Sequence, residues 1–158
     1  MSERIEKIKA NLADARQHLN HILDKVGDRW DTQVYSNGAA WTVRQLLIHL
    51  MVTDKGHNNT IKGIASGEET IPADFDLERF NRRSVEKRAE TSIEEARASL
   101  TTTAAERNAW LDSIDDSILD KKGRHGSMRI LSIEEITQVI ADHDRDHGND
   151  IARTLNIS

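Results

Sequence analysis

Cysteine is absent from the 158-residue sequence. The chain therefore forms no disulfide and offers no thiolate, so a metal ion would have to be bound by His, Asp or Glu side chains. No apolar run approaches the roughly 20 residues that a membrane-spanning helix needs, and the N-terminal residues lack the apolar core of a signal peptide. These absences predict a cytoplasmic protein that contacts no membrane.

An excess of positive charge is also missing. The net charge is -5 and the isoelectric point is near 5.8, so the chain has no general electrostatic attraction for nucleic acid. One local basic cluster is predicted to be a solvated helix face, and it consists of Arg79, Arg82, Arg83, Lys87 and Arg88. The sequence has no internal repeat, and its length predicts a single domain over residues 1–158.

Apolar residues recur at alternating steps of three and four along four long segments, which is the spacing of amphipathic helices. Long helices are predicted over residues 2–26, 42–67, 92–114 and 132–155, with a shorter helix over about 77–88. No segment shows the alternation typical of a strand. The pattern predicts an all-α fold, a four-helix bundle with an additional short helix, in which a site would be built from facing helices.

Three of these helices begin with the sequence of a capping box, in which Ser or Thr is followed three residues later by Glu or Gln. The pairs are Thr42 with Gln45, Ser92 with Glu95, and Ser132 with Glu135. Each pair can satisfy two backbone N–H groups that the first turn of a helix leaves free. The capping boxes therefore fix the predicted starts of the second, third and fourth long helices.

The last predicted helix changes character halfway along. Ile133, Ile136 and Ile140 occupy its buried stripe, and the next two positions of that stripe are His143 and His147. Histidines at i and i+4 lie one above the other on one helix face, so their ring nitrogens can converge on a single ion. The same two residues could instead be surface histidines, or core histidines satisfied by hydrogen bonds.

A third imidazole would complete such a site, and His49 is a candidate for it. His49 lies among leucines on the second helix, where a polar ring is usually a hydrogen-bonded core residue but could also be a ligand. The competitor is His57, about 12 Å further along the helix axis, so both cannot bind one ion. We choose His49, because His57 lies in the polar run 54–59, which is predicted to face water or a pocket mouth.

Three further residues of the last helix carry weaker signals. Asp146 and Asp150 each lie three residues after a histidine, and they suit either acceptors for histidine N–H groups or plain surface charges. Gly148 costs about 1 kcal/mol relative to alanine in mid-helix, so we expect a neighbouring helix or a substrate to approach it closely. No residue of the sequence stands out as a general base.

The segment H-D-R-D-H resembles the metalloprotease pattern H-E-x-x-H, but it has Asp at the base position and is followed by a short tail. A closer pattern combines four segments. They are the capped helix W-T-V-R-Q-L-L-I-H-L, the middle segments F-N-R-R-S-V-E-K-R and S-I-E-E-A, and the final H-D-R-D-H-G-N-D-I. Together they resemble the DinB/YfiT-like family of metal-dependent enzymes, over essentially the whole chain.

This resemblance implies a bundle of up-down-down-up connectivity, a homodimer, and one divalent ion, zinc or nickel, bound by His49, His143 and His147. The family includes S-transferases that use a low-molecular-weight thiol (bacillithiol, mycothiol or glutathione) and a thiol-dependent isomerase. The resemblance therefore implies a metal-dependent transferase or hydrolase for a small electrophilic substrate, with Asn81 and Arg88 as substrate contacts. The alternative is a non-catalytic metal-binding or stress-response bundle.

Overall fold

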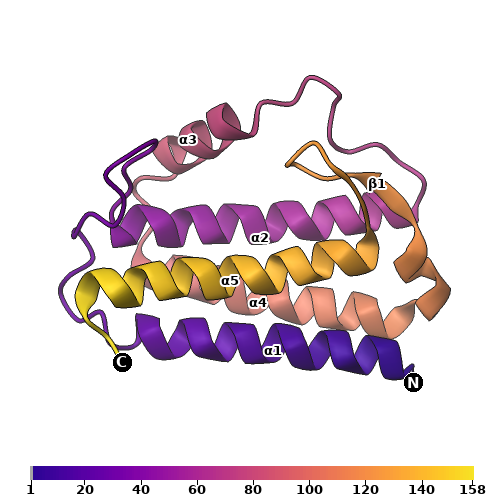
Figure 1. Ribbon diagram of the computed structural model, residues 1–158, viewed down its shortest axis with the longest axis horizontal. Coiled ribbons are helices and arrows are strands. Elements are labelled where there is room, and N and C mark those ends of the chain that lie inside the picture. Colours follow the sequence, from indigo (N-terminus) through magenta and orange to yellow (C-terminus); the bar gives the residue numbers. More distant parts are fainter. Residues whose placement is uncertain (1) are drawn as a thin grey trace.

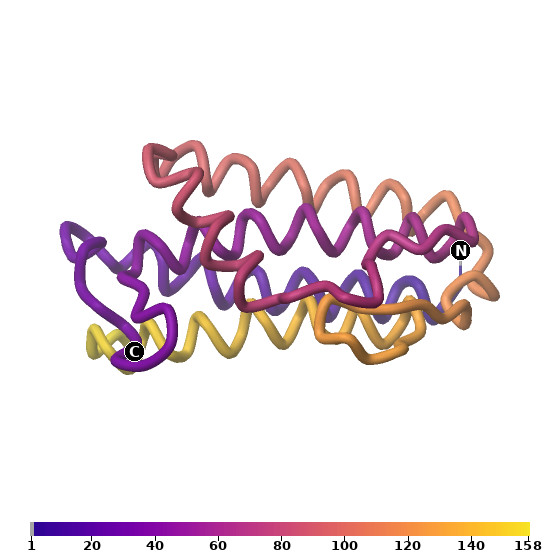
Figure 2. Tube along the Cα trace, turned by 90° about the horizontal axis from the view of Figure 1, so that it is seen from above, coloured from indigo at the N-terminus to yellow at the C-terminus, as the bar shows by residue number. Residues whose placement is uncertain are grey.

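The computed structural model describes residues 2–158, and four long helices form its frame (Figure 1). They are α1 (Glu3–Leu23), α2 (Val43–Ala65), α4 (Ile93–Ser113) and α5 (Ile133–Leu155). Helices α1 and α5 run in one direction and α2 and α4 in the other, which is the up-down-down-up connectivity that the resemblance implied (Figure 1). Seen from above, α2 lies between α4 and α5, and α1 packs along α5 (Figure 2). No helix in residues 2–158 is long and apolar enough to cross a membrane.

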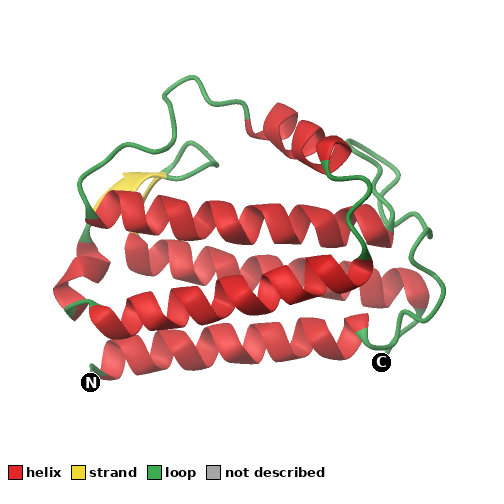
Figure 3. Cartoon of the chain, turned by 180° about the vertical axis from the view of Figure 1, so that it is seen from behind, coloured by secondary structure: helices red, strands yellow, loops and turns green. Residues whose placement is uncertain are grey.

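The predicted short helix is α3 (Leu77–Lys87), and it lies outside the four-helix bundle, beside α2 (Figure 3). The Asp76 side chain caps it by accepting a hydrogen bond from the Arg79 backbone N–H. Its buried side is small, because only Ser84 and Val85 are fully enclosed. The basic residues of α3 and its C-terminal end are exposed, which confirms the prediction of a solvated face.

A β-hairpin follows the 3₁₀ helix η1 (Asp116–Asp120), so the prediction that the chain has no strand is wrong. Strand β1 (Lys122–Arg124) pairs antiparallel with β2 (Ile130–Ser132). Three residues are too few to display an alternating pattern in the sequence. Gly123 also lets β1 approach α2, because a Cβ atom there would lie only 2.5 Å from Ile64 Cγ1.

Side-chain caps fix the helix starts nearly as predicted. Complete capping boxes are present at Thr42 of α2 and at Ser132 of α5. At α4 the Ser92 hydroxyl accepts from the Glu95 N–H, but the structure shows no return bond from the Glu95 side chain. Only one of the two hydrogen bonds of that predicted capping box is therefore formed.

Gly148 marks a close helix–helix contact in the middle of α5. A Cβ atom at this position would lie 3.3 Å from Ile22 Cδ1 and 3.5 Å from Leu19 Cδ1, both on α1. The expected close neighbour is therefore a helix and not a substrate. Glycine weakens a helix, but at this position it allows α5 to pack closely against α1, and these two helices form the most extensive contact of the bundle.

The apolar core consists of two clusters, and a buried polar layer contains charged groups from all four long helices. In this layer Arg16 of α1 donates to Asp54 of α2 (3.2 Å) and to Asp144 of α5 (2.9 Å). Arg107 of α4 donates to Asp54 and to Asn58, both at 2.9 Å. One buried and one largely buried guanidinium group are thus balanced by two buried carboxylates.

This layer corrects part of the prediction for the polar run 54–59, because Asp54 and Asn58 are buried, whereas His57 and Asn59 line a cavity as a pocket-mouth segment would. Asp54, His57 and Asn58 are only 4%, 7% and 4% exposed, whereas Lys55 and Asn59 face water. Polar residues can be buried when partners on other helices satisfy them, and the sequence of α2 alone does not show those partners.

Candidate metal centre

Three imidazoles meet between two antiparallel helices. His49 comes from α2, and His143 and His147 come from successive turns of α5. The Nε2 atom of His143 lies 3.2 Å from that of His49 and 3.0 Å from that of His147. One nitrogen from each residue lies within 4.8 Å of the others, a grouping that could hold a metal ion. The structure thus brings together the three ligands that the resemblance implied.

Tyr35 orients the ring of His147. The tyrosine hydroxyl donates to Asp150 Oδ2 over 2.6 Å, and its oxygen lies 2.8 Å from His147 Nδ1. Since the hydroxyl proton is used by Asp150, we assign the His147 proton to Nδ1, which donates to the tyrosine oxygen. Burial and then the Asp150 hydrogen bond raise the pKa of Tyr35, so the phenol keeps its proton. His147 Nε2 is left with a free lone pair.

Asp150 therefore accepts from Tyr35 and not from a histidine N–H group, so it supports His147 only through the tyrosine. Asp146 forms no hydrogen bond to a histidine within residues 2–158, and it is exposed, as a surface charge would be. Tyr35, on the irregular connection between α1 and α2, is the direct partner of the candidate ligand. Sequence spacing singled out the carboxylate but not the residue that connects it.

His49 is held by two neighbours. The Thr53 hydroxyl donates to the His49 carbonyl oxygen over 2.7 Å and lies 3.4 Å from His49 Nδ1, where it can accept the ring proton. Trp41 packs against the imidazole, with ring centres 4.6 Å apart. These contacts direct His49 Nε2 toward the other two rings.

The positions of the protons on the three rings are compatible with a bound cation. With Nδ1 protonated on His49 and His147, both of their Nε2 lone pairs lie near His143 Nε2. A single N–H group on His143 could satisfy only one of them, whereas a cation would satisfy all three nitrogens. The separations of 3.0 and 3.2 Å are also close to the roughly 3.3 Å between two nitrogens placed about 2.0 Å from a tetrahedral ion.

Burial keeps all three rings neutral, which is the form that binds metals. It lowers the pKa of His49 to about 3, and the neighbouring His147 acts in the same direction. Burial likewise holds the pKa of His143 well below its usual value and lowers that of His147. At neutral pH no proton has to be removed before an ion can bind.

A cavity of about 360 Å³ opens beside His49 and His143. Its walls come from α2, α3, α5, the segment between α2 and α3, and the β1–β2 turn, and the apolar residues among them are Val52, Ile71, Phe75, Leu77, Phe80 and Val139. None of the lining side chains is Asp, Glu, Lys or Arg. The cavity therefore provides no carboxylate that could act as a general base.

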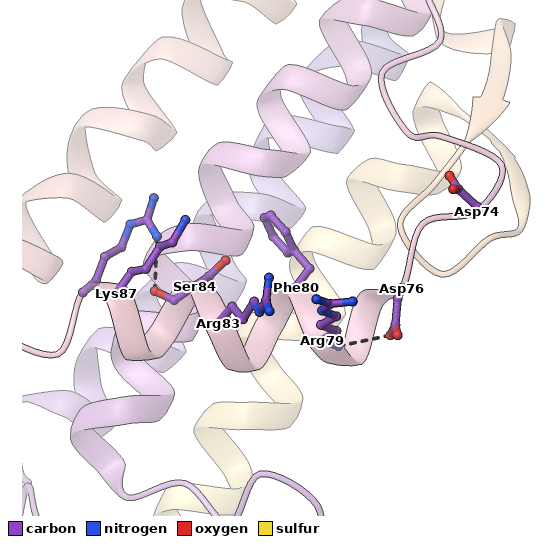
Figure 4. A pocket seen from close by; sticks show the side chains of 8 residues that line it. Asp74, Asp76, Arg79, Phe80, Arg83, Ser84 and Lys87 are labelled. Atoms are coloured by element: carbon purple, nitrogen blue, oxygen red, sulfur yellow. Dashed lines mark hydrogen bonds between the residues drawn. The ribbon is translucent and has the colours of Figure 1, made fainter.

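The two predicted substrate contacts lie in different places. Asn81 lines the cavity beside the three histidines. Arg88 lines a second cavity of about 470 Å³ along α3, and its guanidinium donates to the Ser84 carbonyl. Figure 4 shows three other cationic residues of this cavity, Arg79, Arg83 and Lys87. Phe80 lines both cavities, so the two adjoin at this residue. Only Asn81 stands beside the candidate metal centre.

His125 was not singled out from the sequence, yet it lies in the same cavity. It is carried by the β1–β2 turn and is 7% exposed. Its Nε2 atom lies 2.9 Å from that of His57, although the two residues are 68 positions apart. The available signal was a histidine between Gly123 and Gly126, but it indicated no partner.

An up-down-down-up bundle with three imidazoles converging between α2 and α5 defines a helical-bundle protein with a candidate metal site. The chain belongs to the DinB superfamily, whose model matches residues 11–151. Among solved structures it is similar to YfiT from Bacillus subtilis, described as a probable metal-dependent hydrolase with an unusual four-helix bundle topology. The TM-score is 0.76 at 20% identity, over 100% of this chain and 91% of that one. A comparison with curated proteins gave no match.

Proposed function

We propose that the protein is a divalent-metal-dependent enzyme for a small electrophilic substrate, working as a thiol-dependent S-transferase or as a hydrolase. The observation that carries this proposal is the convergence of three neutral imidazoles beside a cavity, with no fourth ligand grouped with them in residues 2–158. Structural zinc sites are closed by four protein ligands, whereas catalytic sites keep a position open. The membership of the DinB superfamily and the likeness to YfiT support the same proposal.

In this proposal His49, His143 and His147 hold a zinc- or nickel-like ion. When bound, such an ion makes a nucleophile available at neutral pH by lowering the pKa of water or of a thiol. Tyr35 and Thr53 keep the ligand rings oriented through their Nδ1 atoms. The apolar walls exclude bulk water around the substrate, and the Asn81 amide faces the same space.

One observation favours the non-catalytic alternative. The cavity lacks a carboxylate among its lining side chains, so proton transfer would depend on imidazoles or on the substrate. Under this alternative the bundle binds a metal, or responds to stress, without turnover. The homodimer and the cytoplasmic location stay predictions from the sequence.

A screen of thiols tests the enzyme proposal. Zinc- or nickel-loaded protein is incubated with 1-chloro-2,4-dinitrobenzene or with an activated ester, alone or with bacillithiol, mycothiol or glutathione. One thiol should be consumed faster than in buffer, and His143→Ala should return the rate to background. Faster ester cleavage by water alone would select the hydrolase. Background rates in every mixture, with the metal retained, would select the non-catalytic alternative.

A further inference from the structure

His57 and His125 form a second pair of imidazoles in the cavity that His49 and His143 line. Their Nε2 atoms are 2.9 Å apart, their ring planes differ by 8°, and their ring centres are 5.1 Å apart. Because the two nitrogens are much closer than the ring centres, the rings meet edge to edge through a hydrogen bond rather than face to face. Each residue is 7% exposed, so the pair is almost entirely enclosed.

The β1–β2 turn determines which nitrogens of the pair carry protons. The Ser127 backbone N–H donates to His125 Nδ1 over 3.0 Å, so this nitrogen has no proton of its own. His125 must then carry its proton on Nε2, and that group donates to His57 Nε2. His57, in turn, must carry its proton on Nδ1. We assign both tautomers from this chain of hydrogen bonds.

The Nδ1–H group of His57 is an available donor. Residues 2–158 provide no acceptor for it. Within these residues the fully buried side-chain nitrogen and oxygen atoms that lack a hydrogen-bond partner are Ser99 Oγ and Arg107 Nε, so His57 Nδ1 is not fully buried. It is therefore open to the cavity that His57 lines. Burial lowers the pKa of His57 to about 3, so the ring is neutral and its donor group is fixed.

Two other polar groups of the cavity, both threonine hydroxyls, are already engaged, whereas Asn59, Thr70 and Asn81 also line the cavity beside this donor. The hydroxyls of Thr53 and Thr60 donate to the carbonyls of His49 and Gly56, one turn earlier in α2. With no charged lining side chain, the cavity suits a compact and largely apolar molecule that carries an oxygen acceptor. No lysine or arginine lines the cavity to bind a multiply charged phosphate ester.

We propose that His57 binds the substrate by donating its Nδ1–H to a carbonyl or carboxylate oxygen, and that His125 and the Ser127 N–H are positioning groups that hold His57 in this tautomer. The inference rests on the proposed function, because the metal-binding histidines would share the same ligand. It names the substrate class as a small, mostly apolar carbonyl or carboxylate compound.

Benzoate is a suitable probe, and calorimetry of the zinc-loaded protein measures its Kd. His57→Phe keeps an aromatic ring but removes the donor, so it should weaken benzoate binding at least about tenfold. His125→Ala should weaken it less, and His125→Gln should restore it, since the amide N–H can replace the imidazole donor. The matched control is His21→Phe, the same change at an exposed position of α1, which should leave the Kd unchanged.

Two further measurements separate this inference from the proposed function. Zinc content is determined in every sample, and retained zinc with an unchanged benzoate Kd in His57→Phe would overturn the inference alone. Benzoate that fails to bind wild type would also overturn it. Nitrogen-15 NMR of the metal-free protein should show His57 protonated at Nδ1 and His125 at Nε2, and the opposite tautomers would refute the arrangement. If the wild-type protein takes up no zinc, that result would instead contradict the proposed function.

Discussion

Replacing His49 by alanine is expected to abolish metal binding, whereas His57→Ala should keep the metal content of wild type. His49 Nε2 points at the nitrogens of His143 and His147, while the closest partner of His57 is His125 on the hairpin. Loss of His49 leaves two ligands on one helix, too few for a stable site. Loss of His57 removes a cavity wall and leaves all three ligands in place.

Thermal unfolding with and without added zinc distinguishes the two variants. A ligand at 100 times its Kd stabilises the folded state by about 2.7 kcal/mol, and each kcal/mol raises the Tm of a domain of this size by about 2 to 4 °C. Zinc should therefore raise the Tm of His57→Ala by roughly 5 to 10 °C and leave that of His49→Ala unchanged. The reverse pattern would place the ion at His57 and leave His49 as a hydrogen-bonded core residue.

Asp54→Ala is expected to lower the free energy of unfolding by about 3 to 5 kcal/mol. Asp54 accepts from both Arg16 and Arg107, and the side chains of these three residues are at most 13% exposed. Without the carboxylate, Arg16 keeps its partner Asp144, whereas the buried Arg107 guanidinium keeps only the Asn58 side-chain oxygen. An uncompensated buried charge costs far more than the ion pair gains, which gives the substitution its large effect.

Urea denaturation measures this change, with Asp14→Ala as the matched control. Asp14 also pairs with an arginine, Arg145, over 3.1 Å, but its side chain is 77% exposed. Such surface pairs contribute about 0 to 1 kcal/mol, so the control should unfold nearly as wild type does. A loss below about 1 kcal/mol in Asp54→Ala would show that the arginines can reach water when the carboxylate is absent.

The helices of this fold could be predicted because their information is local. The 3.6-residue period predicted that the long segments are helices, and the capping sequences at Thr42 and Ser132 predicted where α2 and α5 begin. Both helices are present in the folded structure with these starts. The i, i+4 spacing placed His143 and His147 on one face for the same reason. His49 followed from its apolar neighbours together with the family resemblance, and the structure brings it to the other two.

The remaining parts of the site depend on contacts between distant segments. Tyr35 meets His147 across 112 positions of sequence, from an irregular connection whose path follows no period. His125 lies on a hairpin with strands of three residues, too short to leave an alternating pattern. Asp54 lies in a polar stretch whose sequence is typical of an exposed surface. Its burial depends on arginine partners on other helices, which the local sequence does not indicate. Local patterns name candidate ligands, but not the groups that orient them.

The metal content of wild-type protein tests the central claim most directly. After growth with added zinc, nickel and manganese, and removal of unbound metal, elemental analysis should find about one divalent ion per chain, bound by His49, His143 and His147. The same treatment of His143→Ala should give only background metal. A wild type without metal, or a His143→Ala variant that keeps its full complement, would contradict the account.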